Sequence, residues 1–85
     1  MISEAVTIAT TPTLICAADN KNRTIYIHNN GGAKIYVGGS AVTTSTGYHI
    51  ANAESQEIFL PVGETLYGCV ASSTNVINIL TPDLD

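Results

Sequence analysis

RTIYIHNNGGAKIYVGG, residues 23–39, is the stretch that decides the fold. Two runs of β-branched and aromatic residues flank a cluster of Asn and Gly, which is typical of two strands joined by a turn. Side chains alternate between faces along a strand, so the two isoleucines of the first run share one face, as do Ile35 and Val37 of the second. We expect all four to point into the core of the protein.

We predict that the two runs pair as an antiparallel hairpin in which Ile27 lies opposite Ile35. The loop of this hairpin is residues 30–32, with Gly32 in the left-handed region. A two-residue turn at the Asn-Gly pair is the alternative, because this dipeptide favours short hairpins. That turn would direct the apolar face of one strand outward, so burial favours the three-residue loop.

The outer face of this hairpin is expected to be partly aromatic. The same register places Tyr26 opposite Tyr36 and His28 opposite Lys34. The two tyrosines then form an exposed patch of the kind that partner proteins cover.

Strand signals recur about every 8–12 residues along the rest of the chain, with turn formers between them. The other expected strands are residues 5–9, 13–17, 41–44, 48–50, 56–60, 65–71 and 75–80. No long stretch shows the period of about 3.6 residues that marks a helix. This pattern predicts an all-β protein, a single small antiparallel β-sandwich of jelly-roll-like type with about eight short strands and no significant helix.

The chain has 85 residues and forms one domain at most. We assign residues 13–80 to the β-sandwich, residues 1–12 to an N-terminal arm or edge strand, and residues 81–85 to an acidic C-terminal tail. A domain this small buries only about 60–65% of its unfolded surface, so stabilising contacts with other subunits are expected.

Charge patterning narrows the range of partners. Only 12% of the residues are charged, against about 25% in a typical domain, and such a surface suits protein–protein packing. The net charge of −4 argues against nucleic acid and anionic lipid as partners. The cations Lys21, Arg23 and Lys34 are expected at solvated strand ends. We expect neither a membrane span nor a secretion signal, because no apolar run is long enough for either.

Reactive side chains do not gather into a catalytic or metal-binding pattern. Cys16 and Cys69 lie in expected strands among apolar neighbours, so we expect free thiols rather than a disulfide. With His28 and His49 they lack the short paired spacing of zinc sites. The carboxylates are scattered over turns and termini, and no serine lies in a nucleophile elbow. We therefore expect no enzyme, no metal and no cofactor.

The order of several short segments resembles a widespread type of small virion protein of tailed bacteriophages. These segments are RTIYIHN at 23–29, IYVG at 35–38, VT at 42–43, GYHI at 47–50, LYG at 66–68 and VINIL at 76–80. Similar modules are capsid cement or decoration proteins, head-fibre bases and tail accessory proteins. We place this chain with the capsid decoration proteins because it is one short domain without a fibre or receptor-binding extension.

The resemblance implies a jelly-roll-like fold and a non-enzymatic homotrimer, which is made in the host cytoplasm and bound to the major capsid protein on the outside of the head. Tyr is enriched in interfaces, so the candidates for subunit or capsid contact are Tyr26, Tyr36, Tyr48, Tyr67 and His49. Ordinary packing on a sheet face is the alternative for each tyrosine.

Two other functions stay open at this point. One is a host-facing, glycan-binding module of a phage tail or fibre, for which Tyr48 and His49 near Asn52 and Glu54 are the candidate residues. The other is an oligomerisation domain of a neck or baseplate complex.

Overall fold

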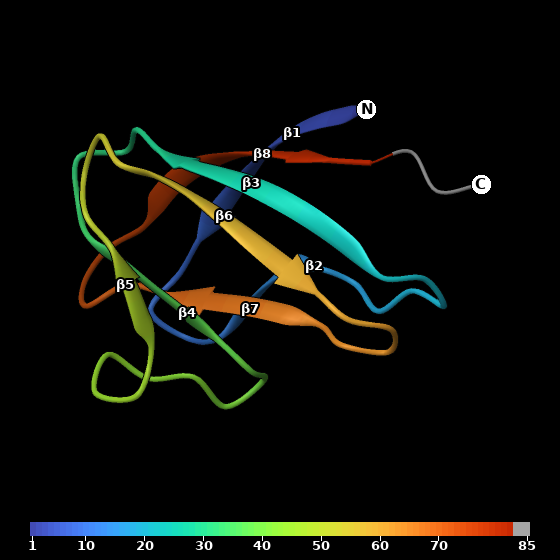
Figure 1. Ribbon diagram of the computed structural model, residues 1–85. Coiled ribbons are helices and arrows are strands. Elements are labelled where there is room, and N and C mark those ends of the chain that lie inside the picture. Colours follow the sequence, from blue (N-terminus) through green and yellow to red (C-terminus); the bar gives the residue numbers. More distant parts are fainter. Residues whose placement is uncertain (83–85) are drawn as a thin grey trace.

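The computed structural model describes residues 1–82 and contains two four-stranded antiparallel sheets packed face to face (Figure 1). Within this part of the chain there is no helix. The prediction of a small all-β sandwich with about eight short strands is therefore confirmed. The acidic tail was assigned to residues 81–85, and residues 83–85 of it lie outside the described residues.

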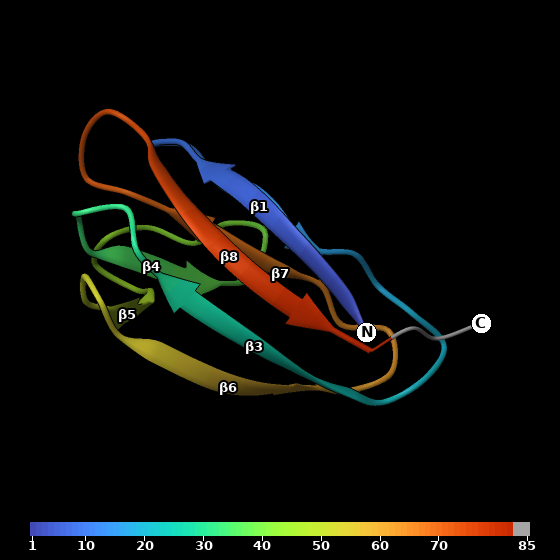
Figure 2. The ribbon, with the colours of Figure 1, turned by 90° about the horizontal axis from the view of Figure 1, so that it is seen from above.

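The strands divide evenly between the two sheets. Sheet A has, in spatial order, β1 (Ile2–Ile8), β8 (Asn75–Thr81), β3 (Arg23–Asn29) and β6 (Ser55–Leu60). Sheet B has β2 (Thr13–Cys16), β7 (Leu66–Cys69), β4 (Ile35–Gly38) and β5 (Tyr48–Ile50). Seen from above, sheet A lies over sheet B, with β1 and β6 at its two edges (Figure 2).

The pairing of the strands is that of a jelly roll. β1 pairs with β8, β2 with β7, β3 with β6, and β4 with β5, each antiparallel. The first half of the chain (β1–β4) thus pairs antiparallel with the second half (β5–β8), and the chain reverses direction in the β4–β5 loop. This long ribbon of paired strands is divided between the two sheets. Strand β1 lies at one edge of sheet A and is paired with β8 along its whole length.

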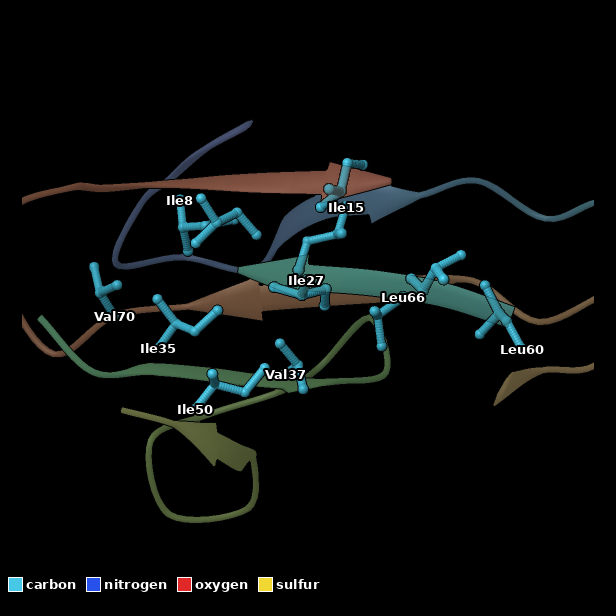
Figure 3. Close-up of a cluster of buried hydrophobic side chains, with 12 residues drawn as sticks. Ile8, Ile15, Ile27, Ile35, Val37, Ile50, Leu60, Leu66 and Val70 are labelled. Atoms are coloured by element: carbon cyan, nitrogen blue, oxygen red, sulfur yellow. The ribbon is translucent and has the colours of Figure 1, made fainter. Parts of the chain in front are cut away.

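The core lies between the two sheets and is built from aliphatic side chains (Figure 3). Inward and outward residues alternate along β3 and β8, as a half-buried strand requires. The buried cluster consists of Ile8, Ile15, Ile25, Ile27, Ile35, Val37, Ile50, Leu60, Leu66, Val70, Ile77 and Ile79. The four inward residues predicted from residues 23–39 are all in this cluster.

The predicted hairpin between β3 and β4 is wrong. β3 pairs with β6 and β8 in sheet A, whereas β4 pairs with β5 and β7 in sheet B. Tyr26 and Tyr36 therefore lie on opposite outer faces, and His28 lies opposite Ser55 and Asn78 rather than Lys34. Alternation fixes which face of a strand is buried, but two strands that face each other across a core satisfy it as well as two neighbours do.

The loop between β3 and β4 takes the chain from sheet A to sheet B. Gly32 has a φ of 93°, as predicted for the left-handed region. Buried Asn29 donates from Nδ2 to the carbonyl oxygens of Ala33 (2.7 Å) and Ile50 (2.9 Å). Asn75, also buried, donates to Asn29 Oδ1 (2.8 Å) and to the Ala33 carbonyl oxygen (3.0 Å). These bonds tie one end of sheet A to sheet B.

The opposite end of the sandwich is held by Arg23, which was expected at a solvated strand end. That expectation is wrong, since Arg23 is only 6% exposed. Its guanidinium donates to the backbone carbonyl oxygens of Ala17, Lys21 (3.3 Å) and Glu64 (3.1 Å). The buried guanidinium thereby finds its hydrogen-bond acceptors in backbone carbonyls of the β2–β3 and β6–β7 loops.

Residues 41–44 were predicted as a strand, and this prediction is also wrong. They belong to the β4–β5 loop, which folds over the outer side of sheet B (Figure 1). Val42 is buried there against Gly38, and its carbonyl oxygen accepts a long contact of 3.8 Å from Cys69 Sγ. The apolar side chain of Val42 is thus buried outside the main core, although residues 41–44 do not form a strand.

Candidate interaction surfaces

The outer side of sheet A, called here the A face, presents three side chains from each strand. They are Ser3, Ala5 and Thr7 on β1, Val76, Asn78 and Leu80 on β8, Thr24, Tyr26 and His28 on β3, and Ser55, Glu57 and Phe59 on β6. The residues of β1 are small, whereas those of the other three strands include several large side chains.

Large apolar side chains are exposed across the A face. Phe59 is 59% exposed, Tyr26 45%, Val76 43% and Leu80 36%. A groove of about 600 Å³ runs over β1, β8 and β3, with Ala5 and Asn78 among its lining residues. Surfaces of this kind mark places where ligands or partners bind.

Polar contacts on the A face hold two of its side chains. His28 Nδ1 and Ser55 Oγ lie 2.9 Å apart. The Tyr26 hydroxyl donates to the carboxylate of Glu57, and this hydrogen bond, together with the negative charge, raises the pKa of Tyr26. The hydrogen bond holds the Tyr26 ring beside β6.

The outer side of sheet B, called here the B face, is formed by Leu14, Tyr36, His49 and Tyr67, together with the loop of residues 39–47. The strands and the loop that form this face carry no Asp, Glu, Lys or Arg side chain.

Aromatic side chains on the B face are partly ordered by their neighbours. The rings of Tyr36 and His49 meet edge to face, with centroids 6.4 Å apart and planes at 62°. Tyr67 lies opposite Leu14 on one side and Gly38 on the other. Leu14 is 46% exposed, so an apolar side chain extends this tyrosine surface towards the edge of the sheet.

Tyr48 lies apart from both faces. It shares the inward side of β5 with Ile50 but is at the edge of the sheet, where its hydroxyl donates to Gln56 Oε1 of sheet A (3.4 Å). The nearby polar groups are engaged within the protein, since Asn52 Oδ1 accepts from the Gly32 N–H and Glu54 Oε1 from the Ala51 N–H. The structure therefore does not assemble the glycan site considered for Tyr48, His49 and these two residues.

The five predicted interface residues thus separate into three places. Tyr36, His49 and Tyr67 share the B face, Tyr26 is on the A face, and Tyr48 is at an edge between them. Sequence reasoning missed Phe59 and Leu80 on the A face. The signal that could have found Phe59 is the alternation in β6, where buried Leu60 implies an outward neighbour.

The two thiols are separate. Cys16 lies opposite Leu66 on β7, and Cys69 is three residues further along that strand. This separation is about 10 Å along the strand, beyond the reach of about 7 Å between Cα atoms that a disulfide tolerates. Both are free cysteines, and burial raises the pKa of Cys69.

Among residues 1–82, no three His, Cys, Asp or Glu side chains are grouped so that they could hold a metal ion. The same part of the chain contains no helix long and apolar enough to span a membrane. Comparison of the whole chain with known protein families, with curated proteins and with solved structures found no match.

Proposed function

We propose that this protein is a structural protein of a phage virion, a capsid cement or decoration protein that binds the outer surface of the head through its B face. The observation that carries the proposal is the charge-free B face, on which tyrosines and Leu14 are presented to solvent or half-buried. Charged residues are depleted and Tyr is enriched at the centres of protein interfaces.

The jelly roll provides such a subunit with two large, opposite surfaces. A protein that binds only the assembled shell stabilises it by mass action, and many copies on one particle multiply a modest contact energy. The proposed partner is the major capsid protein, and the proposed state of the free protein is a homotrimer. A subunit of this kind performs no chemistry, and the proposal includes no cofactor, nucleic acid or membrane.

The alternative of a tail or fibre module that binds host glycans through Tyr48 and His49 is less well supported. Those two side chains point in different directions, and the amide and carboxylate near them are used in loop hydrogen bonds. An oligomerisation domain of a neck or baseplate would use the same uncharged surface, and the location of the copies in the virion distinguishes it from cement.

The proposal is tested by binding the purified protein to phage heads that lack it and measuring the bound fraction by co-sedimentation. We expect Leu14→Asp to reduce binding by at least about tenfold, because it places an unpaired carboxylate beside Tyr67 within the proposed contact. Val62→Asp is the matched control, since Val62 is a similarly exposed apolar residue in the β6–β7 loop. Equal binding of Leu14→Asp and wild type would refute the role of the B face.

The state of the free protein is tested separately by analytical ultracentrifugation. We expect a trimer at micromolar concentration. A monomer at that concentration would contradict the proposed homotrimer.

A further inference from the structure

The groove on the A face has the shape of a small-molecule site. Outward side chains on β1 are small, so the surface beside β8 is low at Ser3 and Ala5. It rises on the other side at Tyr26 and His28 of β3. The resulting hollow of about 600 Å³ lies within the range of about 300–1,000 Å³ that ligand pockets occupy.

Hydrogen-bonding groups converge on this hollow. Asn78 lies on central strand β8 between Ala5 and His28, and its side-chain amide has no hydrogen-bond partner in the described part of the chain. It therefore offers one carbonyl oxygen and two N–H groups to a ligand. His28 is held by Ser55 through Nδ1, which leaves Nε2 available. These groups stand next to the exposed ring of Tyr26 and the side chain of Leu80.

The charges around the groove limit the class of ligand. Glu57 beside Tyr26 and Glu4 on the rim are both acidic, and the A face carries no Lys or Arg. A phosphate, a sulfate or a carboxylate would be repelled here. An acyl chain would cover the Asn78 amide and leave it without a partner, which is unfavourable. A ligand that matches the groove is neutral, with one apolar side and a rim of hydroxyl groups.

We propose that the groove on the A face binds a neutral saccharide. The ring of Tyr26 and the side chain of Leu80 contact the apolar side of a pyranose, while Asn78 and His28 bond its hydroxyl groups. This inference does not rest on the proposed binding of the B face to a shell. Because the two faces are on opposite sides of the sandwich, a copy docked through its B face would present this groove outward (Figure 2).

The test is an NMR titration of the ¹⁵N-labelled full chain with the methyl glycosides of glucose, galactose, mannose and N-acetylglucosamine. We expect saturable shifts with at least one of these sugars, at dissociation constants of about 1–10 mM. The shifts should be confined to amides of the A face around Ala5, Tyr26 and Asn78. Sialic acid, an anionic sugar, tests the effect of the acidic residues around the groove. It should bind more weakly than the neutral glycosides.

Two variants assign the binding to the groove. Asn78→Ala and Tyr26→Ala should each weaken binding about tenfold, and Asn20→Ala, in the β2–β3 loop, should leave it unchanged. Thermal melting checks that each variant is folded. We expect both groove variants to fold, because Asn78 and Tyr26 are exposed. The proposal is overturned if no neutral glycoside gives saturable shifts up to about 50 mM, if both groove variants bind as wild type does, or if sialic acid binds more tightly.

Discussion

The loop glycine Gly31 lies against the buried amide of Asn75, and this contact predicts a large effect of a small substitution. A methyl group added at Gly31 would lie 2.5 Å from Asn75 Cγ and 2.8 Å from the carbonyl oxygen of Val76. Neither distance is tolerable, and Val76 O is part of the backbone of β8. In Gly31→Ala the Asn75 side chain must therefore move away from its partners.

The magnitude follows from the hydrogen bonds that this movement breaks. Asn75 Nδ2 donates to Asn29 Oδ1 (2.8 Å) and to the Ala33 carbonyl oxygen (3.0 Å). Two lost hydrogen bonds, with buried Asn29 left partly unsatisfied, correspond to about 2–4 kcal/mol. That is a large part of the total of roughly 4–13 kcal/mol expected for a domain of this size.

Urea unfolding and thermal melting measure this effect directly. We expect the melting temperature of Gly31→Ala to fall by roughly 10–30 °C. Gly39→Ala is the matched control, because Gly39 is also an exposed loop glycine and has no atom within 4 Å of the added methyl group. If the two variants have the same stability, the hydrogen bonds of Asn75 to Asn29 and Ala33 do not stabilise this end of the sandwich as described.

Three further predictions concern the buried polar and thiol groups. Arg23→Met removes the donor to three loop carbonyl oxygens. The free energy of unfolding, measured in urea, should fall by about 2–4 kcal/mol. An unchanged free energy of unfolding would show that water replaces the guanidinium. Alkylation of the native protein should label Cys16 faster than buried Cys69, and denaturation without reductant should expose two thiols, whereas no label would reveal a disulfide. Burial raises the pKa of Cys69 above its ordinary value of 9.0, so the unfolded chain loses the thiol proton at a lower pH than the folded protein does. The contribution of this thiol to the free energy of unfolding is therefore complete below pH 9 and is lost as the pH rises through the folded pKa. The urea midpoint should therefore decline above about pH 9, and less steeply in Cys69→Ala; identical slopes would exclude this thiol as the cause.

The sequence predicts the faces of the strands better than their partners. Alternation of apolar residues correctly places Ile25, Ile27, Ile35 and Val37 in the core, because each strand buries one face whatever it pairs with. It cannot show whether two such strands are neighbours in one sheet or face each other across the core. The hairpin prediction failed for that reason, since local turn chemistry at residues 30–32 also suits a crossing loop.

The sequence also does not predict which individual side chains are buried when their burial depends on the loops. Arg23 looks like a surface cation in the sequence, and only the meeting of the β2–β3 loop with the distant β6–β7 loop in the fold makes it a buried donor. Val42 looks like a strand residue, but it is buried beneath its own loop. The groove on the A face depends on small residues of β1 lying beside β8, a pairing between the two ends of the sequence.

A cryo-EM reconstruction of the phage particle that carries this protein tests the central claim most directly. We predict many copies on the outside of the head, grouped as trimers, with Leu14, Tyr36 and Tyr67 against the capsid subunits and the A face towards solvent. Copies at the neck, baseplate or tail, or copies whose A face lies against the shell, would contradict it.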